Sequence, residues 1–301
     1  MAAITAELVK DLREKTGAGM MDCKKALAEA EGDLEKAVEV LRKAGMASAG
    51  KKAGRLASEG LIDIHIAGPV AAIVEVNSET DFVAKTLDFQ NFVKQVAEHV
   101  TQAKPASVEA LLQQVPAGAA ANFETLTREL VAKIGENLSI RRFTLLEAKA
   151  GERFGAYLHM GNKIGALVQV KGDAAKLSPE LLKDLAMHVA AASPRFLKRE
   201  QIPEDVKAKE REIYLAQLQD SGKPKEMLEK IVEGKIGKFA AEVCFVEQGF
   251  IKDPTGKKSV QKHLQESDSS AQIVEFVRFQ VGEGMAKKTE DFAAEVAKQL
   301  K

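Results

Sequence analysis

Two strand-like runs around a turn, followed by a helix, occur twice along the chain, and this repeat constrains the fold strongly. The strand runs and the helix of the first copy are at 61–66, 72–76 and 89–100. Those of the second copy are at 157–159, 164–170 and 179–192. Short apolar strands joined by glycine-containing turns are typical of hairpins. We therefore expect two repeated subdomains, each with a small antiparallel sheet, and an α+β fold class.

Residues 1–45 have the pattern of three short helices. Glycine-containing breaks at 17–19 and at Gly32 separate them, and we expect the third helix to end at Gly45. A bundle this small is only marginally stable, so we expect it to share apolar surface with a partner. Residues 46–58 are rich in Ala, Gly, Lys and Ser, which predicts a mobile connector.

The second half of the chain changes in character along its length. Residues 141–146 predict a strand that begins the second subdomain. Residues 197–243 are highly charged with a sparse apolar stripe, which is typical of a projecting antiparallel helical hairpin. A strand at 273–281 and an amphipathic helix at 285–300 follow. The residues alone leave open whether this last helix folds back on the core or docks on a partner.

A chain of 301 residues can bury a sizeable core and form two or three structural units. The expected division is a three-helix domain with its connector at 1–54, a core N-subdomain at 55–140, a core C-subdomain at 141–284 with the hairpin inserted at about 197–243, and a C-terminal helical module at 285–301.

Composition narrows the partner class. The 44 basic and 44 acidic residues give a formal net charge of zero, which argues against a nucleic-acid binder and favours a protein partner. Cys23 and Cys244 are far apart and show no metal-type spacing, so we expect reduced thiols in a reducing compartment. No apolar run has the length of a membrane span or the pattern of a leader. We expect a soluble, cytoplasmic protein that binds no membrane.

The sequence shows no motif of an active site. Residues 255–259 resemble a phosphate loop only superficially, because position 251 is Ile rather than Gly and Lys258 follows Lys257 where a hydroxyl is required. The five histidines have no metal-ligand spacing, and no nucleophile elbow is present. We therefore predict a protein that is not an enzyme, with no catalytic residues, no metal, no cofactor and no direct nucleotide binding.

The string Thr80-Asp81-Phe82-Val83-Ala84 lies between a strand and a helix in the first repeat only; residues 171–175 occupy the equivalent loop of the second. Turn and cap formers precede Asp81 and Phe82, so both side chains lie where a helix begins and can be held out rigidly toward a partner. Spacing alone also allows Phe82 to join a core stripe with Phe89, Val93, Val96 and Val100. The residues by themselves leave both interpretations open.

Several long strings resemble the bacterial elongation factor Ts family, in the family's order and over the whole chain. They are ITAELVKDLREKTGAGMMDCKKALAEAEGDLEKAVEVLRKAG, TDFVAK, AKIGENLSIRR, YLHMGNKIGALV, HVAAASPRF, SGKPKEMLEKIVEGK and RFQVGEG. The family's members are guanine nucleotide exchange factors of elongation factor Tu. The chain departs from the family pattern at Lys85-Thr86, where many members have Arg-Asn, and at Asn162, where Gly is common.

The resemblance implies a fold and a set of partner contacts. The N-terminal module would be a ubiquitin-associated-like three-helix fold. The exchange wedge would be Thr80, Asp81, Phe82 and Val83, with the Asp-Phe pair inserted between helices of elongation factor Tu near its Mg²⁺ and phosphate site. Further contacts on the same partner domain would come from Ile134 and His159. Leu12, Met20 and the C-terminal helix would meet the partner elsewhere, and the helical hairpin could pair two copies in a 2:2 assembly.

Two other classes of function stay open at this point. A scaffold or adaptor would account for the first 45 residues but leaves the 80–84 string and the repeat without a use. An enzyme with an unrecognised site would need convergent polar groups that the sequence does not reveal.

Overall fold

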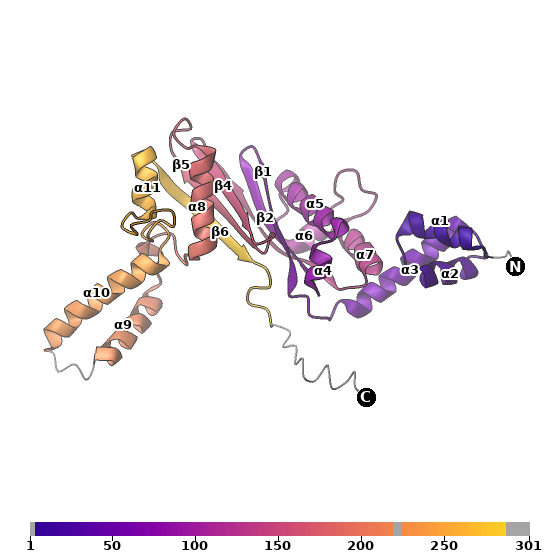
Figure 1. The fold of residues 1–301 in the computed structure, drawn as a ribbon, viewed down its shortest axis with the longest axis horizontal. Helices are drawn as coiled ribbons and strands as arrows, with labels where there is room; N and C mark the ends of the chain where they lie inside the picture. Colours follow the sequence, from indigo (N-terminus) through magenta and orange to yellow (C-terminus); the bar gives the residue numbers. More distant parts are fainter. Residues whose placement is uncertain (1–3, 219–223, 287–301) are drawn as a thin grey trace. The chain divides into compact units, whose positions relative to one another are not determined.

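The structure is a computed structural model that describes residues 4–218 and 224–286 (Figure 1). It combines helices with two small sheets, which confirms the α+β class. The helices are α1 (Ala6–Thr16), α2 (Met20–Glu29), α3 (Leu34–Lys52), α4 (Asp81–Ala84), α5 (Leu87–Ala103), α6 (Val108–Leu112), α7 (Phe123–Ile134), α8 (Pro179–Ala192), α9 (Glu204–Leu218), α10 (Lys225–Val243) and α11 (Val260–Ser267), with a short 3-10 helix at Arg199–Gln201. The strands are β1 (Glu59–Ala67), β2 (Val70–Ser78), β3 (Leu138–Glu147), β4 (Glu152–His159), β5 (Ile164–Lys171) and β6 (Gln272–Gln280).

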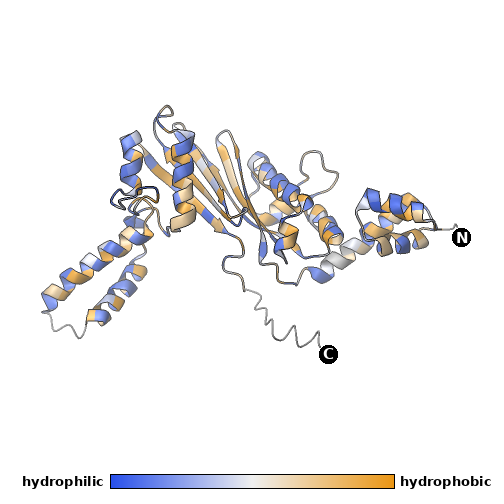
Figure 2. Cartoon of the chain, in the orientation of Figure 1, coloured by the Kyte–Doolittle hydropathy of each residue, from blue (hydrophilic) through white to orange (hydrophobic). Residues whose placement is uncertain are grey.

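The described residues form two compact units. The first contains the described parts of Met1–His65, Val74–Leu145 and Gln280–Lys301. The second contains those of Ile66–Ile73 and Leu146–Phe279. In both sheets hydrophobic residues predominate in the strands, whereas α9 and α10 carry intermixed hydrophilic and hydrophobic residues (Figure 2).

The first sheet has the strand order β1-β2-β3. Both predicted hairpins are present, and so are their helices, as α5 and α8. The strand predicted at 141–146 is also present, but it belongs to the first sheet beside β2 rather than to the start of the second subdomain. A buried carboxylate of β2 accounts for this position, because two arginines of β3 pair with it.

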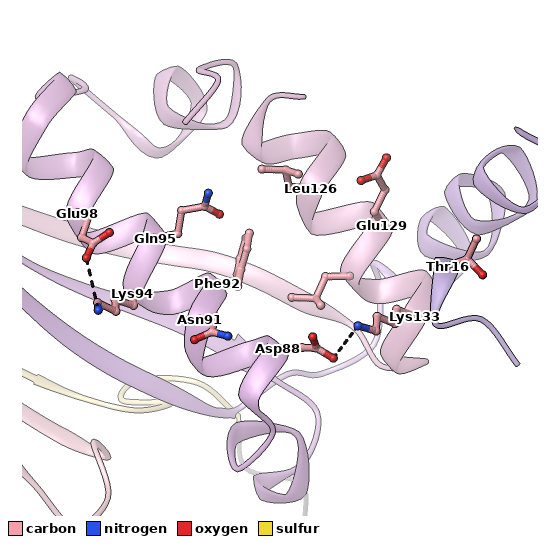
Figure 3. A pocket seen from close by; sticks show the side chains of 11 residues that line it. Thr16, Asp88, Asn91, Phe92, Lys94, Gln95, Glu98, Leu126, Glu129 and Lys133 are labelled. Carbon is pink, nitrogen blue, oxygen red and sulfur yellow. Dashed lines mark ion pairs between the residues drawn. The ribbon is translucent and has the colours of Figure 1, made fainter. Parts of the chain in front are cut away.

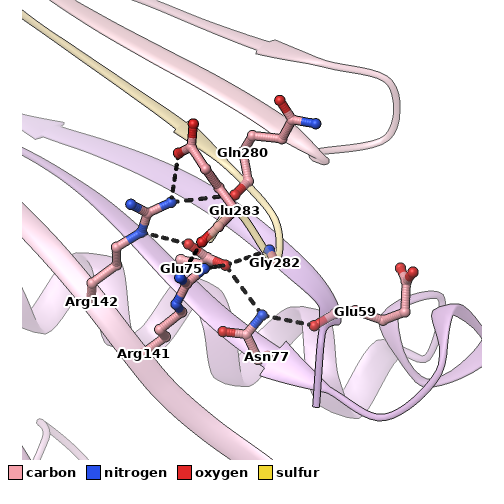
Figure 4. A network of polar contacts seen from close by, with 8 residues as sticks. All are labelled: Glu59, Glu75, Asn77, Arg141, Arg142, Gln280, Gly282 and Glu283. Atoms are coloured by element: carbon pink, nitrogen blue, oxygen red, sulfur yellow. Dashed lines mark hydrogen bonds and ion pairs between the residues drawn. The ribbon is translucent and has the colours of Figure 1, made fainter. Parts of the chain in front are cut away.

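That carboxylate belongs to Glu75 (Figure 4). Its side chain is completely buried and accepts hydrogen bonds from Arg141 Nη1 at 2.8 Å, Arg142 Nε at 2.6 Å and Asn77 Nδ2 at 3.2 Å. The backbone N–H of Gly282 donates a fourth bond at 2.8 Å. Burial by itself would raise the pKa of Glu75, but these donors outweigh it and hold the pKa below its usual value.

The same arginines also hold the segment that follows β6. Arg142 Nη2 contacts Glu283 Oε2 and the carbonyl of Gln280, both within hydrogen-bond distance. Gly282 has a φ of +70°, and a Cβ atom there would lie 2.3 Å from the carbonyl oxygen of Ser58. Only glycine fits this position without strain, so the backbone can approach both Ser58 and the Glu75 carboxylate.

The second sheet has the order β4-β5-β6. Strands β4 and β5 are antiparallel, with Glu152 opposite Lys171 and His159 opposite Ile164 at the two ends of the register. Helix α8 packs against both strands, and its apolar face joins one core with β5, α11 and β6. The charged hairpin of α9 and α10 is also present and confirms the prediction for that region, although its turn at 219–223 lies outside the described residues.

Helices α1 to α3 form the expected bundle around Leu12, Cys23 and Leu27. The prediction that the third helix ends at Gly45 is wrong, because α3 continues to Lys52. The expected connector at 46–58 is thus helical over its first half. Gly45 serves close packing instead: a Cβ atom there would lie 2.7 Å from Cβ of Ala132 in α7. The C-terminal helix expected at 285–300 lies almost entirely outside the described residues.

His188 of α8 is an uncharged histidine in the core of the second unit. Its side chain is completely buried between the rings of Phe245 and Phe250, whose centroids lie 5.7 and 5.9 Å away. Nδ1 accepts the backbone N–H of Ile251 at 3.1 Å, and Nε2 lies 3.0 Å from Gln248 Oε1. Since Nδ1 already accepts a proton donor, a second ring proton has no acceptor. Burial lowers the pKa of His188, and the bond to Gln248 offsets this only in part.

The packing of α3 on α7 predicts opposite effects for two alanine substitutions in one helix. Gly45→Ala should lower the free energy of unfolding by about 1 kcal/mol, because the added methyl group overlaps Ala132. Gly50→Ala has nothing within 4 Å of the new Cβ atom and should raise the free energy of unfolding by about 0.5 kcal/mol. Urea unfolding followed by circular dichroism measures both. Equal stabilisation by the two substitutions would contradict the close approach.

His188 also predicts a pH dependence. Its pKa is lower in the folded chain than the usual 6.5, so the unfolded chain binds the proton first as the pH falls. The free energy of unfolding should therefore be highest above about pH 6.5 and decrease below it. Urea unfolding at pH 7.5 and 5.5 should show a smaller decrease in His188→Gln than in the natural chain. His263 also has a pKa lowered by burial, so the variant should retain part of the decrease. An unchanged decrease in His188→Gln would refute this assignment.

Candidate functional site

The string at 80–84 forms a single helical turn at the end of β2. Thr80 is extended, with a φ of −128°, and α4 begins at Asp81. The backbone N–H groups of Lys85 and Thr86 donate to the carbonyls of Phe82 and Val83 and close the turn. The structure thus confirms that Asp81 and Phe82 lie at a helix start.

Phe82 points away from the core. Its side chain is 75% exposed, whereas Val83 next to it is 7% exposed. The apolar stripe of α5 is buried without any contribution from Phe82, as Phe89 and Val96 have no exposed surface. The alternative interpretation, in which Phe82 packs into the core, is therefore wrong. A single exposed apolar side chain is common on protein surfaces, so the surroundings of Phe82 decide what it can do.

The surroundings of Phe82 are polar on one side and apolar on the other. Lys85 Nζ lies 2.7 Å from Asp81 Oδ2 and 5.4 Å from the centroid of the Phe82 ring. Leu87, at the start of α5, is also largely exposed. Thr86 donates its hydroxyl to the carbonyl of Val83 at 2.8 Å. At two positions where the chain departs from the family that it resembles, Lys85 and Thr86 thus make local bonds that hold α4.

The loop after α7 lies against this turn. Glu136 accepts two bonds from Thr80, from the backbone N–H at 3.0 Å and from the hydroxyl at 2.6 Å. In return, Glu79 Oε1 accepts the backbone N–H of Asn137 at 2.7 Å. The wedge segment and the end of α7, where half-buried Ile134 lies, are therefore brought together. The Thr80 hydroxyl is bonded to Glu136, Val83 is buried, and half-buried Asp81 is paired with Lys85, which leaves Phe82 as the exposed member of the predicted wedge.

His159 lies in the second unit, at the exposed end of β4. Its Nδ1 is 2.9 Å from the hydroxyl of Tyr157, and the two rings stack with centroids 5.7 Å apart. The turn that follows has positive φ at Met160, Gly161 and Asn162. Asn tolerates this conformation better than most residues, which explains how Asn162 replaces the Gly that is common in the family.

The two predicted contacts in the bundle differ in position. Met20, the first residue of α2, is exposed, as is Met21. Leu12 is completely buried in the bundle core, so its side chain offers no surface to a partner in this conformation. Its side chain fills the core of the bundle.

A groove of about 610 Å³ between α5 and α7 does not have the character of an active site (Figure 3). Its charged groups are paired: Lys133 Nζ lies 2.8 Å from Asp88 Oδ2, and Lys94 Nζ lies 3.7 Å from Glu98 Oε1. Glu129 Oε1 lies 2.9 Å from Nε of Arg42, which is outside the lining. Phe92 forms an apolar part of its lining.

The described residues contain no group of His, Cys, Asp and Glu that could hold a metal ion. None of the described helices is both long and apolar enough to cross a membrane.

The turn at 253–258 explains the superficial phosphate-loop pattern. The Asp253 carboxylate accepts the backbone N–H groups of Thr255 at 3.1 Å, Lys257 at 2.9 Å and Lys258 at 2.7 Å. These bonds lower the pKa of Asp253 to about 2. In a phosphate loop such amides would face a nucleotide. Here a carboxylate of the chain itself occupies them.

The sequence patterns did not predict the residues that anchor the helical turn α4. Glu79, Glu136 and Asn137 make the bonds between the two loops, and none was among the candidate residues. The only signal for them was that Glu136 and Asn137 belong to the string AKIGENLSIRR, which resembles the family. Their pairing is long-range in sequence, so no local pattern could reveal it.

Comparison with known proteins identifies the family of the chain. A family model described as Elongation factor TS matches residues 79–283, from the wedge segment to the segment held by Glu75. Elongation factor Ts of Trichlorobacter lovleyi is 48% identical to the chain, and the match covers 98% of each. Elongation factor Ts of Thioalkalivibrio sulfidiphilus is 50% identical, with 99% of each covered. The chain therefore belongs to the elongation factor Ts family of translation elongation factors.

Proposed function

We propose that the chain is the guanine nucleotide exchange factor of elongation factor Tu. It binds the GDP-bound form, disturbs the Mg²⁺ and phosphate site, and promotes release of GDP so that GTP can bind. The observation that supports this most is the exposed Phe82 ring on an anchored helical turn. An aromatic side chain in this position can enter a gap between partner helices without any rearrangement of its own backbone.

The proposed mechanism needs contacts and no bond chemistry. An exchange factor binds the nucleotide-free partner more tightly than the GDP-bound partner, and reciprocity requires it to weaken GDP binding by the same factor. Insertion of Phe82 would supply such a differential contact, because the ring can be buried only where a partner helix has moved. Buried aromatic anchors commonly contribute about 2 kcal/mol or more to an interface. Asp81 beside it would place a negative charge near the Mg²⁺ and phosphate site.

The remaining expectations form part of the same proposal. The chain acts on a partner rather than on a substrate of its own, it works in the cytoplasm, and it binds neither nucleic acid nor nucleotide. The occupied amides of the Asp253 turn and the paired charges of the groove support the absence of a nucleotide site. A 2:2 assembly through α9 and α10 stays a prediction.

Truncation of the wedge should abolish most of the exchange activity. Phe82→Ala removes the exposed ring and should reduce the stimulated rate of GDP release from elongation factor Tu by about 30-fold, which corresponds to about 2 kcal/mol. Stopped-flow release of a fluorescent GDP analogue measures this rate. The control is Ile251→Ala in the second unit, which also shortens a half-exposed apolar side chain and should change the rate less than about twofold.

The same measurement separates the classes of function. If the natural chain does not stimulate GDP release from elongation factor Tu, a scaffold or adaptor is the better description of its function. If the natural chain is active and Phe82→Ala is equally active, the chain is an exchange factor but Phe82 is not its wedge.

The isolated chain should not bind GDP. Calorimetric titration with GDP and Mg²⁺ at concentrations well above micromolar should give only heats of dilution, because the amides of the Asp253 turn are already bonded. Titration of elongation factor Tu freed of nucleotide provides the positive control. A stoichiometric isotherm with the isolated chain would show a nucleotide site in it and refute the proposal of a pure exchange factor.

A further inference from the structure

Two loops of the first unit hold one another through crossed bonds between side chains and backbone. Glu136, after α7, accepts the backbone N–H and the hydroxyl of Thr80, before α4. Glu79, before α4, accepts the backbone N–H of Asn137, after α7. Each loop thus contributes one carboxylate and receives one. We call this arrangement of Glu79, Thr80, Glu136 and Asn137 the carboxylate clasp.

A third segment joins the clasp through Asn137. The amide Nδ2 of Asn137, a buried residue, donates to the carbonyl of Arg55 at 2.7 Å and to that of Ala53 at 3.3 Å. Arg55 Nη1 in turn lies 3.6 Å from Glu79 Oε1. Ala53 and Arg55 lie one and three residues after the end of α3, the last helix of the bundle. The chain therefore leaves the bundle at the same point where the wedge is anchored.

The wedge depends on such anchors because α4 has only four residues. A single helical turn is unstable in isolation, so neighbouring contacts must fix its orientation. Buried Val83 and Ala84 hold its C-terminal side. The clasp holds its N-terminal side at Thr80, one residue before the turn begins. Thr80 lacks a capping bond to the turn because its hydroxyl is committed to Glu136.

We infer that Glu136 and Asn137 are positioning residues for nucleotide exchange: Glu136 sets where Phe82 is held relative to Ile134, and Asn137 ties the end of the N-terminal bundle to the same point. This inference rests on the proposed function, since it concerns how the wedge is presented. Ile134 precedes Gly135, which ends α7 at a φ of +89°, and Glu136 is the next residue. The Thr80 to Glu136 bonds thus join the segment of exposed Phe82 to that of half-buried Ile134 over a few residues.

Positioning makes a different prediction from simple stabilisation. A displaced Phe82 ring should still allow the chain to dock on its partner through other contacts but should act poorly once docked. Loss of the clasp should therefore lower the maximal rate of GDP release and leave the half-saturating concentration nearly unchanged. A loss of folded protein would instead lower the active fraction, which calibration against the amount of complex formed would reveal.

The kinetic test uses matched variants of Thr80 and Glu136 in the full chain. Thr80→Val removes the hydroxyl at nearly constant volume, and Thr80→Ser keeps it. Glu136→Gln replaces the charged acceptor with a neutral amide, which can accept the Thr80 N–H but must then donate to the hydroxyl. Thr80→Val and Glu136→Gln should each lower the maximal rate by about five- to tenfold, as expected for a bond to a charged group. Thr80→Ser should restore it to within about twofold. The double variant should lose less than the product of the two effects.

A second readout does not involve the partner. The chain contains no tryptophan, so Phe82→Trp introduces a single fluorophore at the wedge. Its fluorescence anisotropy in the isolated chain should decrease when Glu136→Gln or Asn137→Ala is added. Met21→Ala, at an exposed position in the bundle, should leave the anisotropy unchanged.

The outcomes separate the clasp from the proposed function. If Phe82→Ala leaves exchange intact, the wedge itself fails. If Phe82→Ala abolishes exchange while Thr80→Val and Glu136→Gln keep the maximal rate and the anisotropy of the natural arrangement, only the clasp is overturned. A rise in the half-saturating concentration with an unchanged maximal rate also overturns it, because the residues would then serve docking rather than positioning.

Discussion

The first unit depends on one buried charge. Glu75 has no exposed surface, and an unpaired carboxylate in such a place would cost several kcal/mol. Arg141 and Arg142 compensate it from β3, and the N–H of Gly282 compensates it from the segment after β6. Three segments distant in sequence must therefore meet at one point. A single charge thus explains why β3 lies in the first sheet and why the chain returns there after β6.

The anchoring of β2 at Glu75 also supports the helical turn that displays Phe82. Asn77 also bonds Glu75, and the carboxylate clasp begins two residues later at Glu79. The end of β2 is thus fixed at successive residues up to the turn that displays Phe82. Under the proposed function, such a support lowers the backbone entropy that is lost when the ring enters the partner.

Local pattern was sufficient for much of the fold. The repeat predicted both hairpins and the helices α5 and α8, and the turn formers before Asp81 predicted a helix start. Predictions from local pattern failed where a long-range contact overrides a local preference. Gly45 is a helix breaker by propensity, yet α3 continues through it because Ala132 packs against its bare backbone. The strand at Arg141 was assigned to the wrong sheet because its partner, Glu75, lies 66 residues earlier.

The residues of the candidate site could likewise be predicted only in part from the sequence. Spacing alone could not choose between a core position and an exposed position for Phe82, and the family resemblance chose the exposed one, as the structure has it. The family resemblance predicted that Leu12 contacts the partner, yet its side chain is buried in the core of the bundle. Glu136 and Asn137 were missed because their partners, Thr80 and Glu79, are 56 and 58 residues away. Hydrogen bonds across such separations leave no trace in local periodicity.

In the proposed mechanism, Phe82 makes a contact that exists only when the partner has lost its nucleotide. The direct measurement is the ratio of two dissociation constants of the chain, one for GDP-bound and one for nucleotide-free elongation factor Tu. The natural chain and Ile251→Ala should bind the nucleotide-free form far more tightly, and Phe82→Ala should reduce that ratio by at least about tenfold. If Phe82→Ala weakens both complexes equally and leaves the ratio unchanged, Phe82 is an ordinary docking residue and the account is contradicted.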